Sequence, residues 1–191
     1  MSWLEEYGRP TARKVAAAFG STPRFKRHLD EAEQNSIDIL SCDDRPSEGL
    51  VSYSTLGLQR YPNVIDGEDI RIELCGIATP DVPSFANVIA TTAFYVMKDR
   101  WRVAPGITYE SMVGMYNLPV TLKHIVFAAP LEWEELSSVD LGGDVVVRWL
   151  LVIPISDSEL RWKLDKGWDE LENLFVEKGI DYWDLNRSSV V

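Results

Sequence analysis

The longest apolar run in the chain extends from Val145 to Ile155 and is interrupted only by Arg148. A run of this length, rich in valine and isoleucine, is typical of a strand that is buried on both faces of a sheet. Because proline has no backbone N–H to donate, we expect strand pairing to weaken at Pro154. Directly after the run, Ser156 and Glu159 have the spacing of a capping box at the start of a helix. The pattern therefore predicts a central strand that leads directly into a helix.

Shorter patterns predict the other elements. Residues 69–78 alternate apolar with charged positions, which predicts a strand whose second face, carrying Arg71 and Glu73, is wetter. Gly57 indicates a bulge or a close approach of another backbone segment. The remaining predicted strands are residues 36–42, 50–58 and 124–129, and the remaining helices are residues 11–19, residues 85–102 and a last helix with Leu164, Trp168, Leu171 and Phe175 on one side and Gly179 at its end.

The order of these elements decides the fold class. Strands cluster in the middle of the chain and helices are inserted or appended, which is an α+β pattern rather than a regular βαβ alternation. The chain has 191 residues and contains neither a linker nor an internal repeat, so one domain over residues 1–191 is expected. We predict a central mixed, mostly antiparallel sheet packed against helices.

The charge balance narrows the class of partner. The chain has 30 acidic against 19 basic residues, a net charge of −11. Nucleic acid is excluded as a direct partner because binding it requires a basic surface. A basic protein would be attracted, although acidity by itself also serves solubility. Acids at the N-terminus, no spanning apolar segment and only two cysteines, Cys42 and Cys75, predict a protein of the reducing cytoplasm without a membrane partner.

No motif for chemistry is present in the sequence. Phosphate-binding loops, dinucleotide fingerprints, nucleophile elbows and paired-histidine zinc motifs are all missing. Neither histidine has a second ligand at metal spacing, and His124 at the start of a strand is expected to be structural. Cys42 precedes two aspartates that would raise the pKa of its thiol, and Cys75 is expected in the core. We predict no enzyme activity, cofactor or metal site, and an active site assembled from distant residues is the less favoured alternative.

Four segments, in a fixed order along most of the chain, carry a family resemblance. They are residues 145–191 with the runs IPISDSEL, GWDELENLF and IDYWDLNRSSVV, residues 51–58 (VSYSTLGL), residues 70–74 (IRIEL) and residues 124–130 (HIVFAAP). Together they resemble the bacterial Suppressor-of-fused-like domain family. The resemblance implies a mixed sheet with helices and a small non-enzymatic binding protein, of which many neutralise a polymorphic toxin as immunity proteins. Animal relatives hold an extended peptide as an added strand, but this chain is too short for their second, C-terminal half.

The candidate partner-binding residues lie in three acidic segments, two of which contain a tryptophan. Aromatic anchors surrounded by charge are typical of protein interfaces, although both tryptophans could equally pack in the core. The favoured function is an immunity protein that neutralises a basic toxin by direct binding. The alternative is a regulatory or scaffold module that captures an extended peptide at a sheet edge. The candidates are Asp66, Glu68, Asp69, Glu132, Trp133, Glu134, Glu135, Asp181, Trp183 and Asp184.

Overall fold

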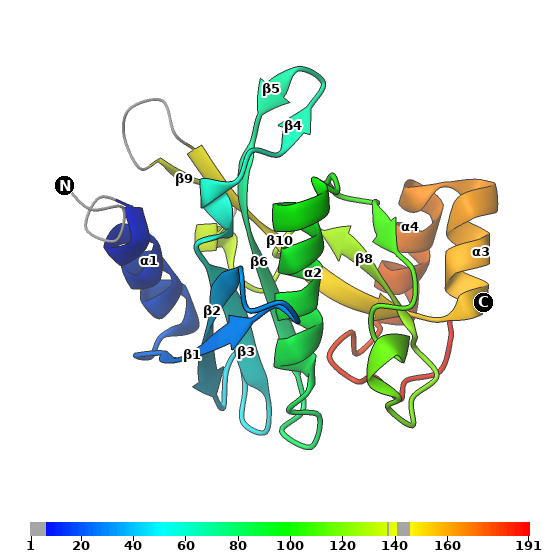
Figure 1. Ribbon diagram of the computed structural model, residues 1–191. Coiled ribbons are helices and arrows are strands. Elements are labelled where there is room, and N and C mark those ends of the chain that lie inside the picture. The colour runs from blue at the N-terminus through cyan, green and yellow to red at the C-terminus, as the bar shows by residue number, and fades with distance from the viewer. Residues whose placement is uncertain (1–6, 137, 141–145) are drawn as a thin grey trace.

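A computed structural model describes residues 7–136, 138–140 and 146–191 of the protein. Its centre is an eight-stranded sheet in the order β1-β2-β3-β6-β10-β8-β7, with β9 paired to β10 (Figure 1). Within the described residues, β10 runs parallel to β6 and the other pairings are antiparallel, so the sheet is mixed and mostly antiparallel, as predicted. The strands are β1 (Arg24–Leu29), β2 (Ser36–Asp43), β3 (Val51–Leu56), β6 (Arg71–Ala78), β7 (Thr108–Tyr109), β8 (His124–Ala128), β9 (Val139–Asp140) and β10 (Val146–Ile155), and a separate hairpin contains β4 (Val64–Ile65) and β5 (Glu68–Asp69).

The predicted central strand is confirmed as β10, and the first residue of the prediction, Val145, lies outside the described residues. β10 is buried on both faces from Trp149 onward because strands and helices enclose it on every side. The parallel pairing with β6 ends at Leu151, whereas the antiparallel pairing with β8 runs through Pro154 to Ile155. Pairing therefore stops before the proline on one side of the strand only.

Helices cover both faces of the sheet. The α2 helix (Phe85–Asp99) lies across one face, in front of the sheet in Figure 1, and buries its apolar side against Ile39 and Leu74. The other face carries α1 (Arg9–Phe19), α3 (Asp157–Lys166) and α4 (Trp168–Lys178), which pack around Trp149 and Leu151. Short 3-10 turns are η2 (Leu58–Arg60), η3 (Gly114–Tyr116) and η4 (Glu134–Leu136).

The wetter face predicted for the strand at residues 69–78 is wrong. Nearly all of β6 is buried, and Glu73 has no exposed surface. Its carboxylate accepts hydrogen bonds from the Thr55 hydroxyl at 2.5 Å and from the backbone N–H of Gly57 at 2.8 Å, with longer bonds from the next two N–H groups. The chain leaves β3 at Leu56 and turns over Glu73 to make these bonds. The group that approaches Gly57 is thus the Glu73 carboxylate, whereas a bulge or another backbone segment was predicted there, and Gly57 has a φ of 113°.

Two helix boundaries differ from the prediction. The helix that starts at residue 85 ends at Asp99 rather than at 102, because Arg100 adopts a left-handed conformation with a φ of 56°. The last predicted helix is divided in two at Gly167, so Leu164 belongs to α3 and is 67% exposed. The capping box at the start of α3 is confirmed. None of the described helices combines the length and apolar character needed to cross a membrane.

The α2 helix packs tightly on the sheet at Gly76 of β6. A Cβ atom on Gly76 would lie 2.9 Å from Phe85 Cε1 and 3.0 Å from Ile89 Cδ1, distances that force the helix or its side chains to move. We expect Gly76→Ala to lower the free energy of unfolding by about 1–3 kcal/mol through overpacking. Urea unfolding measures this effect. Gly114→Ala is the control, because its Cβ meets nothing closer than 3.6 Å, and equal losses in both variants would contradict the packing argument.

Candidate partner-binding surface

The α4 helix supplies an acidic surface next to the hydrophobic core that surrounds Trp149 and Leu151. Leu171 and Phe175 point into that core and are 0% and 6% exposed. Gly179 ends the helix in a left-handed conformation with a φ of 57°, which turns the chain into the C-terminal tail, residues 180–191. The acids on this helix and the first part of the tail are Asp169, Glu170, Glu172, Glu177, Asp181 and Asp184, and the only base between them is Lys178.

A cavity of about 210 Å³ lies between α4, the ends of β8 and β10, and the tail, and we call it the α4 cavity. Ala128, Leu151 and Ile153 contribute from the sheet, and Phe175 and Ile180 contribute from the helix side. Two further lining residues are large apolar side chains that are mostly exposed, Leu131 at 63% and Val176 at 72%; the full lining is Ala128, Leu131, Leu151, Ile153, Trp168, Glu172, Phe175, Val176, Gly179, Ile180 and Tyr182.

Acidic side chains outnumber basic ones around the α4 cavity. Burial, and then the charge of Asp169, raise the pKa of Glu172, the one charged side chain of the lining. Burial and the neighbouring carboxylate of Glu132 raise the pKa of the Tyr182 hydroxyl. The ammonium of Lys178 lies 4.0 Å from the Glu177 carboxylate, in an exposed pair that leaves little net positive charge. A cationic group on a partner would therefore be attracted to this surface.

The C-terminal tail is fixed in place by a buried ion pair. Arg187, which is 8% exposed, donates to Glu159, which is fully buried, with Nη1 at 2.6 Å from Oε1 and Nη2 at 3.1 Å from Oε2. The same arginine donates to the carbonyl oxygen of Pro154, and the carboxylate of Glu159 also accepts from the backbone N–H of Val190. Glu159 belongs to the capping box of α3, so the Arg187–Glu159 pair connects the central strand, the helix and the tail.

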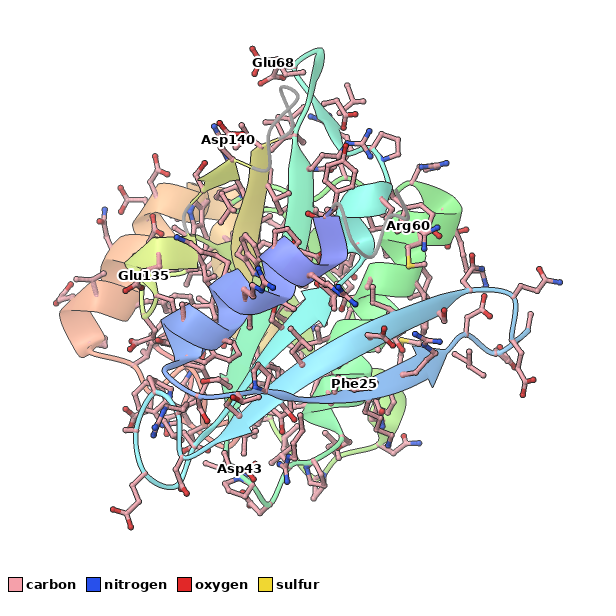
Figure 2. The ribbon with its side chains drawn as sticks, turned by 90° about the vertical axis from the view of Figure 1, so that its left-hand side faces the viewer. Phe25, Asp43, Arg60, Glu68, Glu135 and Asp140 are labelled. Atoms are coloured by element: carbon pink, nitrogen blue, oxygen red, sulfur yellow. The ribbon has the colours of Figure 1, made fainter. Side chains whose placement is uncertain are left out.

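The structure brings two of the three predicted segments together. The effect of Glu132 on Tyr182 places the segment around residues 132–135 beside the segment 181–184. Glu135 is exposed and lies well away from the hairpin tip at Glu68 (Figure 2). Asp181 is also exposed, and the half-buried Asp184 accepts a hydrogen bond from the backbone N–H of Asn186 at 2.8 Å. The side chain of Glu134 lies outside the described residues.

The two tryptophans of these segments pack inward. Trp133 is 2% exposed and its ring lies 4.8 Å from that of Phe19 on α1, so it packs in the core, which is the alternative that the sequence left open for this candidate. The sequence could not distinguish a binding anchor from a core residue because an apolar ring between acids fits either environment. Trp183 is half-buried, lies 5.0 Å from the Tyr182 ring and packs against the same core.

The third predicted segment is separate from the α4 cavity. Asp66 and Gly67 form the tip of the β4–β5 hairpin with positive φ angles of 51° and 89°, and the hairpin projects beyond the sheet (Figure 1). Glu68 is exposed, whereas Asp69 forms an ion pair with Arg71 at 2.7 Å. A second cavity, of about 350 Å³, lies beneath the hairpin. Ile65 and Ile70 line it on the hairpin side, and the cationic Arg148 of β10 is also part of its lining. Charges of both signs thus surround the hairpin.

Four lining residues of the α4 cavity were not among the predicted candidates: Leu131, Glu172, Val176 and Tyr182. Glu172 and Val176 are one helical turn apart, so their shared face was visible in the spacing. Val176, next to the buried Phe175, was also an apolar residue outside the predicted helical stripe. Leu131 and Tyr182 gave no such signal, because they reach α4 only through the packing of distant segments.

The histidine and cysteine side chains, which often take part in catalysis or metal binding, have structural surroundings at His124, Cys42 and Cys75. His124 is 6% exposed, accepts from the Ser111 N–H through Nδ1 at 2.9 Å, and has Nε2 at 3.0 Å from the Asp157 carboxylate. The hydrogen bond with this histidine lowers the pKa of Asp157. Cys42 and Cys75 are free and buried, and burial raises the pKa of each thiol. Among the described residues, no group of three or more His, Cys, Asp and Glu side chains could hold a metal ion.

Comparison with known proteins identifies the relatives of this chain. Residues 33–188 match the family described as Suppressor of fused protein (SUFU). Immunity protein YqcF of Bacillus subtilis (strain 168) is 37% identical over 182 residues, which cover 94% of this chain and 95% of the relative. A crystal structure of a putative SUFU homolog from Neisseria gonorrhoeae FA 1090 has a TM-score of 0.75 to this chain at 20% identity. The match covers 98% of this chain and 98% of that structure.

An animal structure shows how far the likeness extends. Drosophila Suppressor of Fused has a TM-score of 0.68 at 14% identity, and the match covers 96% of this chain but 51% of the animal one. The likeness is therefore one of fold, over about half of the animal protein. With the family match over most of the chain and the bacterial relative over nearly all of it, this chain belongs to the Suppressor of fused family.

Proposed function

We propose that this protein is an immunity protein, which neutralises a cognate protein toxin by binding it directly. The observation that carries the proposal is the 37% identity to Immunity protein YqcF over nearly the full length of both chains. Fold alone would not carry it, because one fold serves many functions. The protein acts by masking the toxin and carries out no covalent chemistry. Its two free, buried cysteines suit the reducing cytoplasm, where a toxin-producing cell needs protection.

The charge of the protein supports a cationic partner. A net charge of −11 gives an attractive field for a basic toxin, which accelerates the encounter of the two proteins. The acids of α4 and the tail concentrate this field beside exposed apolar surface at Leu131 and Val176. Steering charges around an apolar centre are the composition of interfaces that associate fast and dissociate slowly.

Capture of the partner at two salt concentrations tests the proposal. We expect affinity purification from the native organism to retain one toxin-like protein, which forms a one-to-one complex with the purified chain. Because salt screens the steering charges, the Kd of that complex should rise about tenfold or more between 50 and 500 mM NaCl. Calorimetry on the purified pair measures the change. A partner that binds equally at both concentrations contradicts electrostatic steering, and a set of unrelated regulatory proteins contradicts the immunity function.

A second candidate function, capture of an extended peptide, is favoured by the free edge of β1. This strand is last in the sheet, and Phe25 on it is 72% exposed (Figure 2). Arg24 and Arg27 of the same strand form ion pairs with Asp43 and Asp38 of β2, and within the described part of the chain no further strand pairs with the outer side of β1, where a strand could be added. If this function holds, a short synthetic peptide of the partner keeps most of the affinity, whereas an immunity complex needs the folded toxin.

A further inference from the structure

We infer that the α4 cavity is the anchor point for the partner and receives one aliphatic or aromatic side chain from a segment that also carries lysine or arginine. The inference rests on the proposed function for the identity of the partner as a toxin. It deepens that function by naming the surface that binds and the chemistry of the group that it binds.

The size of the α4 cavity sets the kind of group that fits. Its volume of about 210 Å³ is below the roughly 300 Å³ at which sites for drug-sized ligands begin. An apolar protein cavity of about 150 Å³ is sufficient for benzene. The α4 cavity therefore accommodates a single side chain the size of leucine, phenylalanine or tryptophan, and the apolar residues of its lining favour such a group over a polar one.

The exposed residues of the lining indicate that the cavity is open to a partner. Val176 is 72% exposed and Leu131 is 63% exposed, and these residues of two distant segments line the same cavity. Large apolar side chains around a depression, with charged residues beyond them, form the arrangement in which one inserted residue supplies much of the binding energy. Covering Val176 and Leu131 would remove apolar surface from water, which stabilises a complex.

The charges beyond the rim select a cationic neighbour for the inserted side chain. Glu172 lines the cavity, and Asp169, Glu132 and Glu177 belong to the same helix or to the segments that meet it. Lys178 is paired with Glu177 and offsets only one of these charges. A partner that places lysine or arginine next to its apolar residue satisfies both the apolar lining and this acidic rim.

A second copy of this chain is a poorer occupant. The chain does carry an exposed aromatic between basic residues, Phe25 between Arg24 and Lys26. However, Arg24 is already paired with Asp43 at 2.6 Å, and this contact would bring two proteins of charge −11 together. The contact would also be head-to-tail, which leads to open chains of molecules rather than closed dimers. We therefore assign the cavity to a different, basic protein.

A short peptide tests the assignment without a toxin. The probe is acetyl-Lys-Lys-Trp-Lys-Lys-amide, and acetyl-Lys-Lys-Gly-Lys-Lys-amide is the control with equal charge. Titration into ¹⁵N-labelled protein should shift the amide resonances of Val176, Gly179 and Tyr182 with the tryptophan peptide. The Kd of the glycine peptide should be at least about tenfold higher, because this peptide lacks the side chain that would insert into the cavity.

Two matched variants locate the binding site. Val176→Arg covers the cavity, and Leu164→Arg makes the same change of charge at a residue that is 67% exposed on α3 and lines no part of the cavity. Both positions are exposed, so both variants should fold as the wild type does. We expect the Kd of the tryptophan peptide to rise about tenfold or more in Val176→Arg and less than about threefold in Leu164→Arg.

Each contrary result overturns the assignment. Unshifted cavity resonances, equal binding of the two peptides, or equal effects of the two variants would show that the cavity is not the anchor point. Self-association that Phe25→Ser abolishes would assign the cavity to a second copy. If the Val176→Arg variant neutralises the toxin as well as the wild type does, the cavity is not the anchor point, although the proposed function stands. If the peptide binds at the cavity but no toxin is neutralised, the proposed function alone fails.

Discussion

Arg187→Ala is expected to lower the free energy of unfolding by about 3–5 kcal/mol, because it leaves the carboxylate of Glu159 buried without its counter-ion. Glu159 has no exposed surface in the wild type, so its charge depends on this guanidinium and on its other hydrogen bonds rather than on solvent. The variant also loses the hydrogen bond to the Pro154 carbonyl and the contact of the guanidinium with the Phe175 ring at 5.3 Å. Chemical denaturation of wild type and variant measures the difference.

Two comparisons separate the buried charge from the loss of an arginine as such. Arg161→Ala removes an exposed arginine from the same helix that carries Glu159, and we expect a change within about 0.5 kcal/mol. Adding Glu159→Gln to Arg187→Ala removes the uncompensated charge and should recover part of the stability, because glutamine still fits the capping box. A loss below about 1 kcal/mol in Arg187→Ala would contradict the role of this ion pair in holding the tail.

Stability should fall with rising pH through the ionisation of Glu73. Burial raises the pKa of this carboxyl from 4.5 to about 7, against the opposing effect of its hydrogen bonds from Thr55 and the backbone of residues 57–59. A carboxyl whose pKa is raised by folding stabilises the protein fully below pH 4.5, and this contribution is lost as the pH rises through about 7. A shift of this size corresponds to about 3 kcal/mol.

The comparison of wild type with Glu73→Gln isolates this ionisation from the other carboxylates. The difference in their free energies of unfolding, measured in urea between pH 4 and 8.5, should move in favour of the glutamine variant as the pH rises. Glu68→Gln, which removes an exposed carboxylate at the hairpin tip, is the matched control, and its difference is subtracted from that of Glu73→Gln. A flat difference for Glu73→Gln would show instead that the hydrogen bonds to the carboxylate balance the burial.

Local patterns predicted β10 and the start of α3 correctly. The apolar run and the Ser156–Glu159 spacing act through neighbouring residues, so the sequence contains the information directly. The alternation of apolar and charged residues along β6 led to the wrong prediction that Glu73 lies on a wetter face. A charged residue indicates an exposed face unless a distant segment supplies hydrogen bonds to it. The donors to Glu73 come from residues 55–59, which the alternation of β6 cannot reveal.

The acidic segments at the edge of the candidate surface were predicted from the sequence, whereas the α4 cavity at its centre was not. Acidity singled out the segments at Glu132 and Asp181, and the structure places these two side by side. The α4 cavity between them is made by β8, β10, α4 and the tail together, so no single segment carries its pattern. Gly167 also divided the predicted last helix, because its φ of 98° cannot continue one. That break sets the direction of α4 and with it the position of Val176.

Rescue of growth shows whether this protein neutralises a toxin in cells. The toxin-like protein captured with this chain is expressed from an inducible promoter, alone or with the chain, in cells that lack both genes. We expect the toxin alone to arrest growth and co-expression of the wild type to restore it. Leu164→Arg should restore growth equally, whereas Val176→Arg at equal abundance should not. Arrest that persists with abundant, folded wild-type protein would contradict the immunity function.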